Sequence, residues 1–148
     1  MTNAFIVGSK RTAFGSFGGK LSNITAAQLG GYAAKAALAQ LPANTPVSST
    51  VFGVVAHTDH TAPYTSRHVG HYAGLPINVP ALTINRLCGS GFQAVINAIH
   101  EIKVGDSDVV LTGGTENMSM SPYTLHGVRF GNTCLLYTSD AADEGLGV

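Results

Sequence analysis

Short apolar runs of strand length alternate along this chain with segments in which apolar residues recur every three or four positions. The runs occupy residues 4–9, 51–56, 81–87 and 108–112. Runs of this kind predict buried strands, and the three-and-four spacing between them predicts helices. Because alternating strands and helices are typical of an α/β fold, we expect a mostly parallel sheet with helices on both faces.

Local signals mark where these helices begin and end. Thr25 and Gln28 have the spacing of a capping box, so the first helix is expected to begin there. A short helix is expected near residues 66–73, and a longer one precedes the last apolar run. Gly74 and Gly105 stand where these two helices should end, because glycine adopts the left-handed conformation that ends many helices.

The composition limits what the chain can bind. Its 148 residues allow one domain or part of one, and only 11% of them are charged, against about 25% in an average globular protein. So few charges predict that much of the surface is covered by a partner chain or by further sequence. Eight Lys and Arg balance eight Asp and Glu, so no basic stripe is present to bind nucleic acid.

Three further features bear on the compartment. The apolar runs are too short for a membrane span, which takes about 20 residues. Cys88 and Cys134 are too few for a disulfide framework and fit a reducing compartment. The first residues lack the regions of a secretory signal, so secretion is not expected, although an uncleaved organellar address is compatible with them.

Cys88 stands where the run at residues 81–87 meets the sequence Gly-Ser-Gly and the helix that follows. A cysteine at a helix N-terminus lies near the positive end of the helix dipole, which favours the thiolate. The glycines leave its approach open, and the backbone N–H groups of the turn could stabilise an oxyanion. These residues alone allow either a nucleophile or a buried, inert cysteine.

Residues 89–94 also fit the G-x-G-x-x-A pattern of dinucleotide-binding folds. That pattern requires an acidic residue roughly 20 positions later, at the carboxyl end of the next strand. Asp106 and Asp108 precede that strand, and Glu116 follows two further glycines. Dinucleotide binding is therefore the weaker interpretation.

Two close pairs of histidines raise the alternative of a metal site. No cysteine lies near them, and Asp59 is the only carboxylate close by in sequence. We therefore expect no metal site, and we expect the pairs to be polar surface or interface. The pairs are His57 with His60 and His68 with His71.

NRLCGSGFQA at residues 85–94, together with GGTENMSMSPY at residues 113–123, resembles the thiolase family, most of all the 3-ketoacyl-CoA thiolases. KRTAFGSFGG at residues 10–19 and RHVG at residues 67–70 fit the same family. The resemblance covers about residues 5–131 in one register. It implies a thiolase-like α/β fold that is incomplete here.

The resemblance implies that Cys88 attacks a 3-ketoacyl thioester, releases acetyl-CoA, and holds the acyl group until free coenzyme A removes it. It also implies that Asn117 and Met118 lie near the acyl pocket, although their spacing alone favours an ordinary turn. Coenzyme A is then a substrate, and no separate cofactor or metal is expected. Thiolases form dimers and tetramers, which would account for the low charge. The likeness to fatty-acid β-oxidation enzymes favours the mitochondrion over two alternatives, the cytoplasm and the peroxisome.

Two alternatives remain open: a condensing enzyme of the ketoacyl-synthase type, which shares the fold, and a non-catalytic interaction fragment. The chain contains no G-H-P and no C-x-G-G-G motif, which in the family supply the base and the second cysteine. We therefore expect little or no turnover from this polypeptide alone. Residues 1–131 are expected to form a truncated thiolase N-terminal domain, and residues 132–148, with Cys134, an unrelated tail produced by a sequencing or joining artefact.

Overall fold

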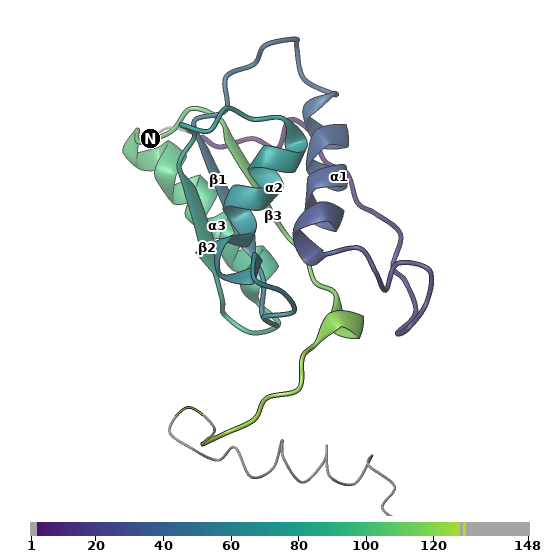
Figure 1. Ribbon diagram of the computed structural model, residues 1–148. Coiled ribbons are helices and arrows are strands. Elements are labelled where there is room, and N and C mark those ends of the chain that lie inside the picture. The colour runs from purple at the N-terminus through teal and green to yellow at the C-terminus, as the bar shows by residue number, and fades with distance from the viewer. Residues whose placement is uncertain (1–2, 128, 130–148) are drawn as a thin grey trace, which may run out of the picture.

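Three parallel strands form the sheet in the computed structural model, which describes residues 3–127 and 129. Strand β1 (Ser49–Gly53) lies between β2 (Ala81–Ile84) and β3 (Val110–Gly114) and is parallel to both (Figure 1). The predictions of strands at these three places are confirmed, with boundaries shifted by a few residues. The central strand is completely buried, as its run of β-branched and aromatic residues predicts.

Helices cover both faces of this sheet, as predicted (Figure 1). Helix α3 (Ser90–Val104) packs on β1 and β3, whereas α2 (Thr65–Ala73) packs on the other face against β1 and β2. Helix α1 (Ala26–Leu38) packs mainly on α2. Two short 3₁₀ helices, η1 (Ala62–Tyr64) and η2 (Met118–Met120), complete the described elements.

The predicted helix ends are confirmed. The Thr25 side chain accepts a hydrogen bond from the Gln28 N–H, and the Gln28 side chain accepts one from the Thr25 N–H, so both halves of the capping box are present. Gly74 and Gly105 follow α2 and α3 with φ values of 90° and 86°. Both glycines therefore have the left-handed conformation that the sequence analysis expects.

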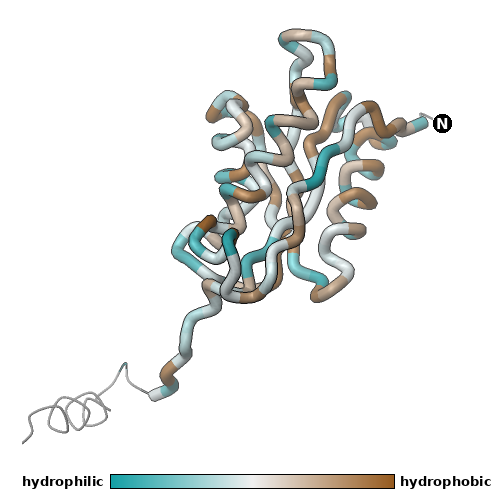
Figure 2. The backbone as a smooth tube through the Cα atoms, turned by 90° about the vertical axis from the view of Figure 1, so that its right-hand side faces the viewer, coloured by the Kyte–Doolittle hydropathy of each residue, from teal (hydrophilic) through white to brown (hydrophobic). Residues whose placement is uncertain are grey.

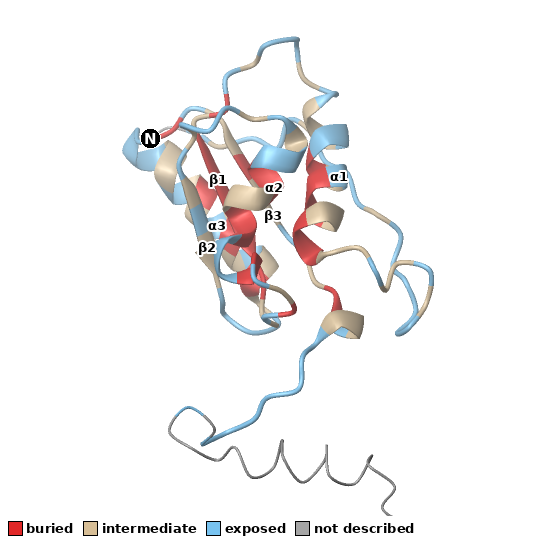
Figure 3. Ribbon diagram, viewed as in Figure 1, coloured by how far each residue is buried: buried red, intermediate tan, exposed pale blue. Residues whose placement is uncertain are grey.

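The core lies between β1 and the layer of α1 and α2 (Figure 3). Its largest member is Phe52 of β1, which packs with Val69 of α2 and Ala34 of α1. The two helices approach so closely that α1 requires glycine at the crossing. A Cβ on Gly31 would lie 2.4 Å from the Cβ of Tyr72, closer than real Cβ atoms come to one another.

The prediction of a buried strand at residues 4–9 is wrong. The segment has no regular secondary structure and pairs with no strand among the described residues, and Ile6 is 83% exposed. Figure 2 shows this largely hydrophobic segment beside the N-terminal label. The physical reason is the lack of a neighbouring strand among the described residues: residues 4–10 line a cleft of about 500 Å³ together with residues of α1, α3 and β3.

Candidate active site

The three strands end at one edge of the sheet, because Gly53 of β1 pairs with Ile84 of β2 and with Gly114 of β3. The N-terminus of α3 rests directly on two of these ends. A Cβ on Gly53 would lie 2.6 Å from the carbonyl carbon of Ser90, and one on Gly114 would lie 3.2 Å from the Cα of Gly91. Glycine at the strand ends therefore lets the helix start immediately above the sheet.

The turn that leads from β2 into α3 contains a left-handed leucine. Leu87 has φ of 50°, which for a bulky residue costs about 1–2 kcal/mol. Two side chains hold it there: Asn85 Oδ1 accepts from the Leu87 N–H at 3.0 Å, and Ser90 Oγ donates to the Leu87 carbonyl at 2.6 Å. Ser90 Oγ also accepts from the Arg86 N–H at 2.8 Å. The turn is therefore fixed by its own polar side chains.

Cys88 follows this leucine and is exposed, with a free thiol. Exposure excludes the alternative of a buried, inert cysteine, and the predicted position between a strand and a helix N-terminus is confirmed. Among the described residues the N–H groups of Gly91 and Phe92 have no hydrogen-bond acceptor. A Cβ on Gly91 would touch nothing within 4 Å, so space beside this first helical turn is open. The N–H groups are free to receive a negatively charged oxygen.

Glu116 is part of this edge, although it was not among the site residues predicted from the sequence. Its carboxylate accepts two hydrogen bonds from consecutive backbone groups of the loop after β1, from the Val55 N–H at 2.9 Å and the Ala56 N–H at 3.1 Å. Val55 in turn accepts from the Asn85 side chain at 3.3 Å. Two signals could have found it: Glu116 lies within the GGTENMSMSPY motif at residues 113–123, and it comes two residues after the end of β3, where ligand-binding residues gather at the sheet edge.

Asn117 and Met118, predicted to lie near the acyl pocket, follow the end of β3 at the same edge. The Asn117 side chain is buried, and its amide nitrogen donates to three backbone carbonyls of the segment before α1, at 2.7–3.3 Å. Its donors therefore already anchor that segment. Met118 is 55% exposed and available for contact. A role in binding substrate stays a prediction for both residues.

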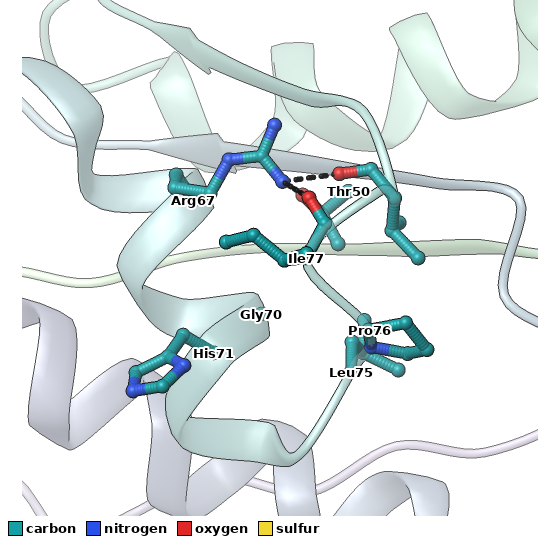
Figure 4. A pocket seen from close by; sticks show the side chains of 8 residues that line it. Thr50, Arg67, Gly70, His71, Leu75, Pro76 and Ile77 are labelled. Carbon is teal, nitrogen blue, oxygen red and sulfur yellow. Dashed lines mark hydrogen bonds between the residues drawn. The ribbon is translucent and has the colours of Figure 1, made fainter.

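A small pocket lies between β1, α2 and the loop that follows α2 (Figure 4). Arg67 reaches across it and donates to the carbonyl groups of Ile77 and Val79. Its volume of about 10 Å³ fits no more than a single water molecule. Arg67, which belongs to the RHVG motif at residues 67–70, therefore fastens the loop after α2 to that helix. The pocket is too small to bind a thioester.

The histidine pairs do not form a metal centre in the part of the chain that the structure describes, where no three His, Cys, Asp or Glu side chains gather. In residues 3–127 and 129, no helix combines the length and the apolar character that crossing a bilayer demands.

The fold and the site define a class: α/β proteins that present an exposed cysteine between a strand and a helix, at the carboxyl edge of a parallel sheet. Within that class, the family described as thiolase, N-terminal domain, matches residues 4–141. The human mitochondrial 3-ketoacyl-CoA thiolase is 49% identical over 132 residues, which are 88% of this chain and 33% of that protein. The chain therefore belongs to the thiolase family and spans about a third of the length of this relative.

Solved structures agree with the sequence match. The crystal structure of the human mitochondrial enzyme in complex with CoA superposes with a TM-score of 0.82 at 50% identity, over 86% of this chain and 32% of that chain. The Bacillus anthracis acetyl-CoA acetyltransferase gives 0.77 at 35% identity, with the same coverage. The predicted thiolase-like, incomplete α/β fold is thus confirmed. The predicted tail, residues 132–148 with Cys134, lies outside the described residues.

Proposed function

We propose that this chain supplies the acyl-accepting cysteine of a thiolase, an acyltransferase that cleaves 3-ketoacyl-CoA with free coenzyme A. The observation that carries the proposal is the exposed Cys88 at the N-terminus of α3. The turn that carries it is fixed by side-chain hydrogen bonds to Leu87. Family membership supports the reaction type, since the relatives are named 3-ketoacyl-CoA thiolase and acetyl-CoA acetyltransferase.

The chemistry proceeds through two transfers. The Cys88 sulfur, as thiolate, bonds to the C3 carbonyl carbon of the 3-ketoacyl-CoA, and that carbonyl oxygen becomes an oxyanion. The oxyanion collapses and the C2–C3 bond breaks, which leaves the shortened acyl group on sulfur; the departing C2 takes up a proton, equivalent to the one that the Cys88 thiol gave up, and leaves as acetyl-CoA. The thiol sulfur of free coenzyme A then attacks the carbonyl carbon of the acyl-cysteine thioester, and the bond between that carbon and the Cys88 sulfur breaks. Acyl-CoA is released, and Cys88 regains a proton, equivalent to the one that the coenzyme A thiol loses.

In both transfers, backbone N–H groups of α3 stabilise the oxyanion. A negatively charged oxygen forms each time a nucleophile adds to a carbonyl group, and donors that are already oriented stabilise it without reorganisation. The N–H groups of Gly91 and Phe92 are candidates for this contact, because they belong to the first turn after Cys88 and lack acceptors within the described chain. We assign Met118, and with it Asn117, to the wall of the acyl pocket.

The wider setting belongs to the same proposal. Coenzyme A and acyl-CoA are the substrates, in line with the CoA complex of the human relative. Assembly with further copies would cover the large apolar side chains that are exposed here, among them Phe14 and Phe17 at 88% and 82%. We place the protein in the mitochondrion, as the human relative is named mitochondrial.

The test asks for one acylation event per chain and needs no turnover. The protein is incubated with acetoacetyl-CoA and its intact mass is measured, followed by peptide mapping. We expect one acetyl group on Cys88, none in the Cys88→Ser variant, and an unchanged adduct in Cys134→Ser, the matched control that removes the other cysteine. Absence of the adduct in the wild type, or its persistence in Cys88→Ser, would refute the proposal.

A further inference from the structure

We propose that Glu116 is a positioning residue for Cys88, acting through one peptide unit of the neighbouring loop and through Asn85. The inference rests on the proposed function, since positioning matters only if Cys88 accepts an acyl group. Within the described part of the chain, the hydrogen bonds of the Glu116 carboxylate go to the loop after β1 and not to the turn that carries Cys88. Its influence has to pass through groups that touch both.

The first link is the peptide unit between residues 55 and 56. Its N–H, on Ala56, donates to Glu116 Oε1 at 3.1 Å, and its carbonyl, on Val55, accepts from Asn85 Nδ2 at 3.3 Å. The carboxylate and the side-chain amide therefore bind opposite ends of the same planar group. A charged acceptor on the N–H polarises the carbonyl and makes it a better acceptor.

The second link is the side chain of Asn85. While its Nδ2 donates to Val55, its Oδ1 accepts from the Leu87 N–H at 3.0 Å. The amide plane is thus fixed at both ends, and its oxygen holds the residue with φ of 50° that precedes Cys88. If the Val55 contact is lost, the amide can rotate and the left-handed Leu87 loses one of its restraints.

Glu116 fixes the position of the loop after β1 with both of its carboxylate oxygens. Its second oxygen, Oε2, accepts from the Val55 N–H at 2.9 Å, so two consecutive peptide units are held by one carboxylate. No described cation forms an ion pair with it, so its polar contacts go to this loop. Glutamine in its place would turn an amide donor toward one of the two N–H groups and lose that contact.

The experiment compares two reactions of Cys88 in wild-type protein and in Glu116→Gln. Transfer of the acetyl group from acetoacetyl-CoA requires an oriented sulfur, whereas alkylation by iodoacetamide requires only an accessible one. We expect the acylation rate constant at saturating thioester to fall by about 10- to 100-fold, because a small misplacement of a reacting atom has effects of this size. The alkylation rate and the half-saturating thioester concentration should not change.

Controls separate positioning from general damage. Glu101→Gln removes charge from another partly buried glutamate, bonded to Ser107 rather than to this loop, and should leave both reactions unchanged. Asn85→Ala should slow acylation like Glu116→Gln, and the double variant should be no slower than Asn85→Ala alone. Equal losses in acylation and alkylation, or additive losses in the double variant, would overturn the proposal.

A second measurement does not depend on the acyl transfer. Amide hydrogen exchange of the Leu87 N–H, followed by NMR, should be faster in Glu116→Gln than in wild type and unchanged in Glu101→Gln. Unchanged exchange in Glu116→Gln would overturn the network. If wild-type protein forms no adduct while Leu87 exchange responds to Glu116, the proposed function fails and the contact network stands.

Discussion

The carboxyl edge of the sheet and the flank of β3 differ sharply in how many backbone groups find partners. At the carboxyl edge, the strand ends are joined by the Thr115 N–H to the Gly53 carbonyl at 3.0 Å and the Val54 N–H to the Ile84 carbonyl at 3.1 Å. Beside β3, residues 3–9 have a single hydrogen bond to the rest of the described chain, from the Ser9 N–H to Gln40 Oε1.

The difference teaches which properties of this chain are local. The turn that holds Cys88 is fixed by contacts among three loops that are all present, so its geometry does not depend on what covers β3. The opposite holds for residues 4–9, whose apolar side chains face a cleft of about 500 Å³. Exposed apolar surface beside an unpaired sheet edge is a site of self-association. Substitutions in the two regions should therefore have unlike effects.

The largest expected effect is at the contact between β1 and α3. Gly53→Ala places a Cβ within 2.6 Å of the Ser90 backbone, which cannot move as a flexible side chain would. We expect a loss of about 3 kcal/mol in the free energy of unfolding, the upper range for overpacking, measured by urea denaturation. Gly91→Ala is the matched control: its Cβ meets nothing, and alanine in a helix gains about 0.5–1 kcal/mol. Equal stability of the two variants would contradict this account.

The next largest effect concerns the hydrogen bonds of Asn117, which connect the carboxyl edge of the sheet to the segment before α1. Asn117→Ala leaves three backbone carbonyls of residues 21–24 without the amide that binds them, so we expect a loss of about 2 kcal/mol. Asn97→Ala, which removes only a side-chain contact with Gln93 on α3, should lose nothing measurable. If Asn117→Ala were as stable as Asn97→Ala, the amide would not be anchoring the segment before α1.

The same contrast explains what the sequence could predict. β1, β2, β3 and the three helices follow from local patterns, because each element is recognised by the spacing of its own residues. Residues 4–9 have the composition of a strand, but composition does not show whether a partner strand lies beside them. Here the described chain provides none, and the segment stays exposed.

The candidate site divides in the same way. Cys88 was predictable because strand, turn and helix signals meet within ten residues. The contacts of Glu116 were not, since the hydrogen bonds that join it and Asn85 to the loop after β1 link residues 30, 60 and 61 positions apart. Such contacts form only when the strands pair in one particular register. The pattern of residues along a single sequence does not show which register that is. The left-handed Leu87 is held by nearby side chains, but leucine is not a residue type that indicates a positive φ.

The smallest expected effect is that of Val7→Thr, which is compared with the same chemical change at Val51. Valine and threonine have nearly the same shape, so Val→Thr exchanges a methyl group for a hydroxyl group. Val51, at the centre of β1, is 0% exposed, and a hydroxyl group buried there should lower the free energy of unfolding by about 1–3 kcal/mol. Val7 is 66% exposed, and Val7→Thr should stay within about 0.5 kcal/mol of wild type, because water continues to reach the side chain. Urea midpoints of the two variants measure the difference directly. A loss in Val7→Thr as large as in Val51→Thr would mean that residues 4–9 are buried in solution, either against β3 or against another copy.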